Sequence, residues 1–141
     1  MSTTEESVLS FGPDQTLIGI LTTPSADAAD AGIGCLLLNT GVNHRIGPRR
    51  VNVKAARRLA GSGIPCLRFD MTGIGDSKAS SGREDYRQQQ LADMRAALDQ
   101  FQASTGLSRF VIFGVCTGAA NALTLALAHA RVVVVLVVDW H

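Results

Sequence analysis

Short, strongly apolar runs alternate with segments of helical periodicity over most of this chain, and this alternation is the feature that most restricts its fold. Four such runs follow one another at strand length: Cys35 to Asn39, Pro65 to Phe69, Phe110 to Phe113 and Val132 to Val138. Runs this apolar are typical of strands that are buried on both faces. The order strand, helix, strand therefore predicts a parallel sheet with right-handed crossovers and helices on both sides.

The segment between the first two runs is predicted to be an amphipathic helix. Val51, Ala55 and Leu59 form its apolar face. The opposite face is basic and comprises Arg50, Lys54, Arg57 and Arg58. Gly61 and Gly63 are expected to end this helix.

Two further helices are predicted after the second and third runs. Ser81 and Glu84 have the spacing of a capping box, and apolar residues then recur at helical intervals up to Gly106, namely Leu91, Met94, Leu98 and Phe101. The last helix is rich in Ala and Leu and is expected to extend from Thr117 to about Ala130.

The chain begins with a predicted β-hairpin. Val8 to Phe11 and Thr16 to Thr22 are strand-like, and the turn residues Gly12-Pro13-Asp14 separate them. The expected fold class is therefore α/β, with three layers and a mostly parallel sheet that starts with an N-terminal hairpin. No repeat or linker divides the sequence, so one domain or part of one is expected.

Composition argues against a dedicated nucleic-acid binder. The 141 residues carry 13 Lys and Arg against 12 Asp and Glu, which gives a net charge of +1. Basic residues gather between Asp30 and Asp70, where no acidic residue occurs. A solvated helix face is the favoured explanation, and recognition of an anionic substrate group is the alternative.

The cysteines and the N-terminus point to a reduced, cytoplasmic environment. The three cysteines form no metal-binding or disulfide pattern, and MSTTEESVLS lacks the basic and apolar regions of a secretory peptide. The apolar stretch from Gly118 to Val138 is interrupted by polar residues, including Asn121 and His129, so we expect a buried helix and strand and no membrane span. No metal and no cofactor are expected.

Residues 114–118, Gly-Val-Cys-Thr-Gly, have the pattern of a nucleophile elbow in which cysteine takes the place of serine. A strand precedes the pattern and a helix follows it, and the flanking glycines permit a sharp turn. The start of that helix would present free amides and a positive dipole end to Cys116, which favours the reactive thiolate. The alternative is a small structural cysteine in a glycine-rich turn.

Two other loops agree with an elbow at Cys116. The segment Asn39-Thr40-Gly41-Val42 follows the first apolar run, where acyl-transfer enzymes of this architecture place an oxyanion donor. The glycine turn Asp70 to Ser77, of the form DxxGxGxS, follows the second run.

These three motifs together resemble the α/β-hydrolase superfamily. Among its branches the sequence is most similar to the serine-aminopeptidase-like hydrolases found with exosortase and exopolysaccharide systems, some of which carry cysteine at the elbow, and it resembles dienelactone hydrolases less. The resemblance implies that residues 1–141 are the N-terminal portion of one hydrolase domain, truncated after the sixth strand. It further implies a small-molecule acyl substrate, an ester, thioester or amide, with Cys116 as nucleophile and the backbone amides of Thr117 and Val42 as oxyanion hole.

The resemblance also implies a general base and an acid beyond the last strand, at positions that this chain does not contain. His44 lies in the loop of the proposed oxyanion donor, so it is expected to contact substrate and is a weaker candidate for the base. Asp139 and His141 are interpreted as chain terminus, and His129 lies far along the last helix from Cys116.

Two other functions remain open from the residues. One is an inactive hydrolase-fold fragment or interaction module. The other is a nucleotide-binding domain, which the fingerprint does not favour: Gly73-Ile74-Gly75 is followed by Lys78 where a third glycine is needed, and no GxxxxGK[ST] occurs.

Overall fold

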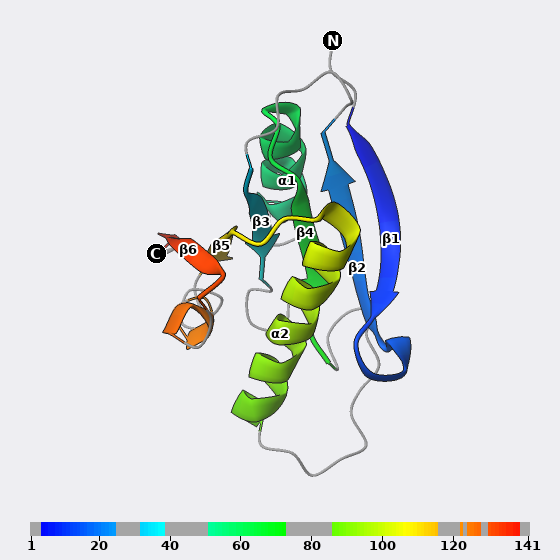
Figure 1. Cartoon of the computed structure of the whole chain (residues 1–141), viewed down its shortest axis with the longest axis vertical. Helices are drawn as coiled ribbons and strands as arrows, with labels where there is room; N and C mark the ends of the chain where they lie inside the picture. Colours follow the sequence, from blue (N-terminus) through cyan, green and yellow to red (C-terminus); the bar gives the residue numbers. More distant parts are fainter. Residues whose placement is uncertain are drawn as a thin grey trace.

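A six-stranded sheet forms the centre of the computed structural model, which describes residues 4–24, 32–38, 51–72, 86–115, 122, 124–127 and 130–138. The strand order across the sheet is β1-β2-β4-β3-β5-β6 (Figure 1). The strands are β1 (Glu5–Phe11), β2 (Leu17–Thr23), β3 (Gly34–Leu37), β4 (Cys66–Asp70), β5 (Phe110–Val115) and β6 (Val132–Val138). The predicted α/β fold with a mostly parallel sheet is confirmed.

The N-terminal hairpin forms the antiparallel edge of this sheet. β1 pairs with β2 along its whole length, and β2 pairs antiparallel with β4. A short 3-10 helix, η1 (Pro13–Gln15), connects the two hairpin strands. The other neighbouring pairs, β4 with β3, β3 with β5, and β5 with β6, are all parallel.

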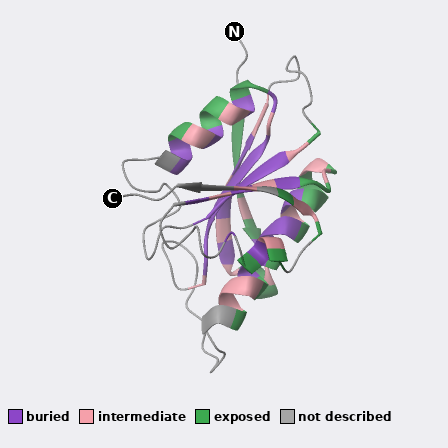
Figure 2. Cartoon of the chain, turned by 90° about the vertical axis from the view of Figure 1, so that its left-hand side faces the viewer, coloured by how far each residue is buried: buried purple, intermediate pink, exposed green. Residues whose placement is uncertain are grey.

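Helices cover both faces of the sheet. Figure 2 shows α1 (Val51–Gly61) on one side and α2 (Tyr86–Thr105) on the other, with the buried strands between them. The larger core lies on the α2 side and includes Phe69, Phe101 and Phe110, together with Ala122 and Leu125 from the helical residues that follow β5. The smaller core lies under α1 and comprises Cys35, Leu37, Ala56 and Cys66.

Both described helices end at the glycines that were predicted to end them, Gly61 and Gly63 for α1 and Gly106 for α2. Gly63 follows α1 with a φ of 96°, and Gly106 follows α2 with a φ of 77°. These left-handed values favour glycine, because a Cβ atom strains the backbone there. Gly106 donates its amide to the carbonyl of Gln102 at 2.7 Å, which satisfies one of the free carbonyls at the end of α2.

The structure corrects several predicted strand boundaries, and β5 runs to Val115 and not to Phe113. β1 begins at Glu5 and not at Val8, because polar residues also pair with β2. β3 ends at Leu37, whereas a strand to Asn39 was predicted, and Asn39 itself lies outside the described residues. The expected capping box at Ser81 also lies outside them.

In the part of the chain that the structure describes, no helix is long and apolar enough to cross a membrane.

Candidate active site

Three parallel strands end at the same edge of the sheet, and each leads to one of the predicted motifs. β3 leads to the segment with Val42, β4 to the glycine turn, and β5 ends at Val115, directly before Cys116. Cys116, Thr117, Val42 and His44 themselves lie outside the described residues, as do residues 73–80 of the glycine turn. The described residues therefore define the framework from which the motifs leave.

The chain changes face at this edge between β3 and β5. β3 leads to α1 on one face of the sheet, whereas β5 leads to helical residues whose Ala122 and Leu125 pack in the core of the α2 face. Neighbouring strands whose connections diverge in this way leave a crevice at their carboxyl ends, and open α/β sheets bind ligands there. The topology therefore predicts a crevice at the carboxyl ends of β3 and β5.

A backbone hydrogen bond fixes the two strand ends relative to each other. Leu37 is the register partner of Phe113, and the amide of Leu38 donates to the carbonyl of Phe113 at 3.1 Å. The proposed oxyanion segment therefore starts beside the strand that carries the proposed nucleophile.

The end of β3 has a second contact, from Asn52 in the first turn of α1. This side chain is 1% exposed, and its Nδ2 donates to the carbonyl of Leu38 at 3.3 Å. Its Oδ1 is buried and has no hydrogen-bond partner in the part of the chain that the structure describes.

The end of β4 is held by Asp93 of α2. The buried carboxylate of Asp93 accepts the backbone amide of Thr72 at 2.7 Å and the hydroxyl of Thr72 at 2.9 Å. The side-chain amide of Gln89, one turn earlier on α2, donates to the same carboxylate at 2.8 Å. Because Thr72 belongs to the predicted glycine turn, Asp93 fixes the start of that turn.

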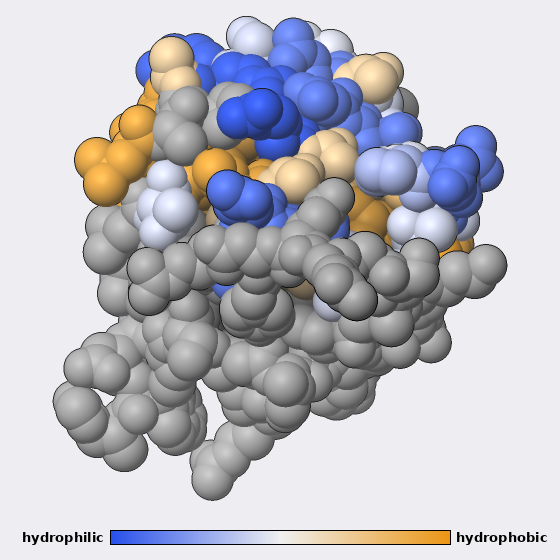
Figure 3. Space-filling view, turned by 90° about the horizontal axis from the view of Figure 1, so that it is seen from below, coloured by the Kyte–Doolittle hydropathy of each residue, from blue (hydrophilic) through white to orange (hydrophobic). Residues whose placement is uncertain are grey.

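Figure 3 shows the surface of the molecule from below, and the described residues on that surface are mainly hydrophilic.

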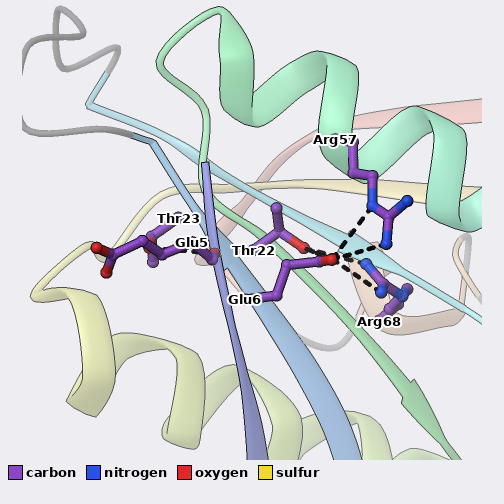
Figure 4. A network of polar contacts seen from close by, with 6 residues as sticks. All are labelled: Glu5, Glu6, Thr22, Thr23, Arg57 and Arg68. Carbon is purple, nitrogen blue, oxygen red and sulfur yellow. Dashed lines mark hydrogen bonds and ion pairs between the residues drawn. The ribbon is translucent and has the colours of Figure 1, made fainter. Parts of the chain in front are cut away.

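A polar network joins the hairpin to β4 and α1 (Figure 4). The carboxylate of Glu6 accepts hydrogen bonds from Arg57 at 2.9 Å, from Arg68 at 2.9 Å and from the hydroxyl of Thr22 at 2.9 Å. Partial burial by itself raises the pKa of Glu6, but the hydrogen bonds from Arg57, Arg68 and Thr22 outweigh it and lower this pKa to about 2. The network belongs to the scaffold, because it pairs the charge of Arg68, whose side chain is only 6% exposed.

Cys35 and Cys66 are buried in the core under α1, and both are free thiols. They are register partners on β3 and β4. A hydrogen bond between the two thiols, together with burial, raises the pKa of Cys66 well above its usual range. Both cysteines therefore have the environment of structural residues.

Among the described residues, no group of three or more His, Cys, Asp or Glu side chains is arranged to hold a metal ion.

Solved structures match this fold, and several of them are described as α/β-hydrolases. A hypothetical protein from Pseudomonas aeruginosa matches with a TM-score of 0.78 and 19% identity, over 95% of this chain and 42% of the other. A cold-adapted esterase from an Arctic intertidal metagenomic library matches with a TM-score of 0.69 and 22% identity, over 96% and 60%. A dienelactone hydrolase-like promiscuous phosphotriesterase from metagenomic libraries matches with a TM-score of 0.71 and 20% identity, over 95% and 58%.

The fold is therefore that of the α/β-hydrolases. The sequence identifies the family within this class. The sequence model of the serine aminopeptidase, S33, family matches residues 37–138, so the chain belongs to this family of hydrolases. A search of curated proteins found no match. The chain spans between 42% and 60% of the length of the three solved structures described above.

Sequence reasoning missed the residues that hold the strand ends. Asp93 lies among the apolar positions of α2 and was interpreted only as a polar residue between them. Asp93 stands directly before Met94 on the buried face of α2. A buried carboxylate without a partner is unfavourable, so this position by itself predicts a hydrogen-bond or ion-pair partner. Asn52 had a similar signal, since it lies between Val51 and Val53 at the start of a helix.

Proposed function

We propose that this chain carries the nucleophile and the oxyanion hole of an acyl hydrolase that acts on an ester, thioester or amide. Cys116 is the nucleophile, the backbone amides of Thr117 and Val42 stabilise the oxyanion, and His44 contacts the substrate. The substrate is a small molecule, and the reaction needs no cofactor.

In this reaction the thiolate of Cys116 attacks the carbonyl carbon and forms a C–S bond. The carbonyl electron pair moves onto oxygen, where the two backbone amides stabilise the negative charge. When the tetrahedral intermediate collapses, the oxyanion pair re-forms the carbonyl and the bond to the leaving group breaks. The leaving group departs with the electron pair of that bond and takes a proton from water where it needs one, and a thioester remains on Cys116. Attack of water on this thioester releases the acid and restores the thiol.

The observation that carries this proposal is the arrangement of β3 and β5. These neighbouring strands are tied by the hydrogen bond from Leu38 to Phe113, and they lead to opposite faces of the sheet. The crevice expected between their ends is the place where acyl-transfer enzymes of this architecture bring nucleophile and oxyanion donor together. Membership of the serine aminopeptidase, S33, family supports the same chemistry.

Acylation by p-nitrophenyl acetate tests the proposal. The rate at which each cysteine is acylated is compared between the native chain and the chain unfolded in urea. The three cysteines lie in three different tryptic peptides, residues 1–45, 59–68 and 110–131, so mass spectrometry assigns each acyl group. We expect Cys116 to react at least about tenfold faster in the native chain, because only the folded site supplies the oxyanion donors.

Cys35 and Cys66 are the internal controls, since burial slows their reaction in the native chain. Cys116→Ala should abolish the fast release of p-nitrophenolate, and Cys35→Ala should preserve it. If native Cys116 reacts no faster than unfolded Cys116, it is an ordinary cysteine in a turn and the proposal is wrong.

A further inference from the structure

Asn52 ties together the two ends of the segment that carries the proposed oxyanion donor. It lies one residue after the start of α1, and its side chain donates to the carbonyl of Leu38 at 3.3 Å. Because a carbonyl only accepts, the amide nitrogen of Asn52 must face it, which fixes the orientation of the side chain. This one contact joins the two ends of residues 39–50, the segment that includes Val42.

Leu38 is in turn fixed to β5. Its amide donates to the carbonyl of Phe113 at 3.1 Å, and its side chain is buried. The polar atoms of Leu38 are therefore engaged on one side by the strand that leads to Cys116 and on the other by α1. Loss of the Asn52 contact would free the carbonyl of Leu38, the last described residue before the oxyanion segment.

Stability alone is a poor reason for asparagine at this position. Its Oδ1 is buried and has no hydrogen-bond partner among the described residues, and a buried acceptor without a partner lowers stability. Local features that lower stability concentrate at functional sites.

We propose that Asn52 is a positioning residue for the oxyanion hole, because it fixes Leu38, the last described residue before the segment with Val42, beside the strand that leads to Cys116. This inference rests on the proposed function, because it assigns Asn52 a role in the same site. Asn52 does not touch the reacting atoms in this mechanism and acts through Leu38.

Two reagents separate positioning from general damage to the site. Acylation of Cys116 by p-nitrophenyl acetate passes through an oxyanion, whereas alkylation by iodoacetamide displaces iodide from a saturated carbon and forms none. The first reaction needs the donors of the oxyanion hole, and the second needs only an accessible thiolate. The ratio of the two rates at Cys116 therefore reports the oxyanion hole.

Asn52→Asp removes the donor without changing the size of the side chain, and Asn52→Ala tests the same contact without introducing a charge. In the variants that circular dichroism shows to be folded, we expect acylation of Cys116 to fall by about 10- to 100-fold. Alkylation should change by less than about twofold, because neither the thiolate nor access to it depends on the oxyanion hole.

Glu6→Gln is the matched control, since it disturbs a polar network in which Glu6 binds Thr22, Arg57 and Arg68 and not Leu38 or Asn52, and it should leave both rates unchanged. Equal loss of both rates in the Asn52 variants, or no change in either, would overturn the inference. So would failure of both variants to fold, because Asn52 would then be needed for the scaffold itself. A wild-type chain without enhanced acylation at Cys116 refutes the proposed function instead, and this result is read before any variant is compared.

Discussion

Glu6 shows how one side chain on an edge strand stabilises a buried charge. Its side chain is 28% exposed, yet its carboxylate pairs the guanidinium of Arg68 and also binds Arg57. A single substitution at position 6 therefore leaves a buried cation without its counter-charge.

We predict that Glu6→Gln lowers the free energy of unfolding by about 1–3 kcal/mol at neutral pH. Because folding lowers the pKa of Glu6 from 4.5 to about 2, the ionised carboxylate stabilises the fold fully above pH 4.5. This contribution disappears as the pH falls from 4.5 to about 2. Urea unfolding of both proteins across this pH range should show the difference between them shrinking toward acid, and a difference that does not depend on pH would contradict the assignment.

Asp93 has the same importance at the end of β4. Asp93→Ala removes an acceptor that serves the amide and hydroxyl of Thr72 and the amide of Gln89. We predict a loss of about 2–4 kcal/mol in urea unfolding, since these buried donors lose their partner. Thr72→Val removes the hydroxyl, which donates to Asp93 and accepts from Gln89, but it keeps the bond of the backbone amide and should cost less. If the two substitutions are additive in the double variant, the carboxylate does not act through Thr72.

At the scale of elements, the approach of α2 to the sheet depends on the absence of a side chain at the start of β3. A Cβ atom at Gly34 would lie 2.7 Å from Cζ of Phe101, whose ring stacks against Phe110 at a centroid distance of 4.9 Å. The aromatic pair therefore occupies the space that any other residue at position 34 needs.

We predict that Gly34→Ala lowers stability by about 1–3 kcal/mol because the helix must shift away from the sheet. Gly61→Ala is the matched control, since no atom lies within 4 Å of a Cβ placed there. That substitution should be neutral or stabilise α1 by up to about 1 kcal/mol. Thermal unfolding of both variants measures the contrast, and equal melting temperatures would show that the core yields to the extra methyl group.

At the scale of the whole molecule, the two outer strands of the sheet differ in character. β1 carries polar residues, whereas β6 is a run of seven aliphatic residues, and Val133 on it is 40% exposed. Natural sheets usually protect an edge with charges, because an unpaired apolar strand promotes association between chains.

We therefore predict that the 141-residue chain associates as its concentration rises. Val133→Lys should weaken this association, because a charge on β6 disfavours pairing with another strand. Val8→Lys places the same charge on the opposite edge strand, β1, and should have little effect. Sedimentation velocity over a range of concentrations distinguishes the variants, and a wild-type chain that stays monomeric throughout would contradict the prediction.

The sequence by itself determined the order of strands and helices, the ends of both described helices and the family. Apolar runs, such as the one that begins at Cys35, and the glycines that end helices, such as Gly63 and Gly106, are local properties of the sequence. They can be recognised without knowing which residues are their neighbours in the folded chain. The sequence also indicated the chemistry proposed for Cys116, which remains a prediction.

Only the tertiary structure decided which residues hold the edge where the motifs begin. The contacts of Asn52 with Leu38 and of Asp93 with Thr72 join residues that are 14 and 21 positions apart, and the ion pair of Glu6 with Arg68 spans 62. No local pattern specifies such partners, because a polar residue within an apolar face shows that a partner is needed but not where it lies. The sheet order, which brings β3 and β5 side by side, supplies that information.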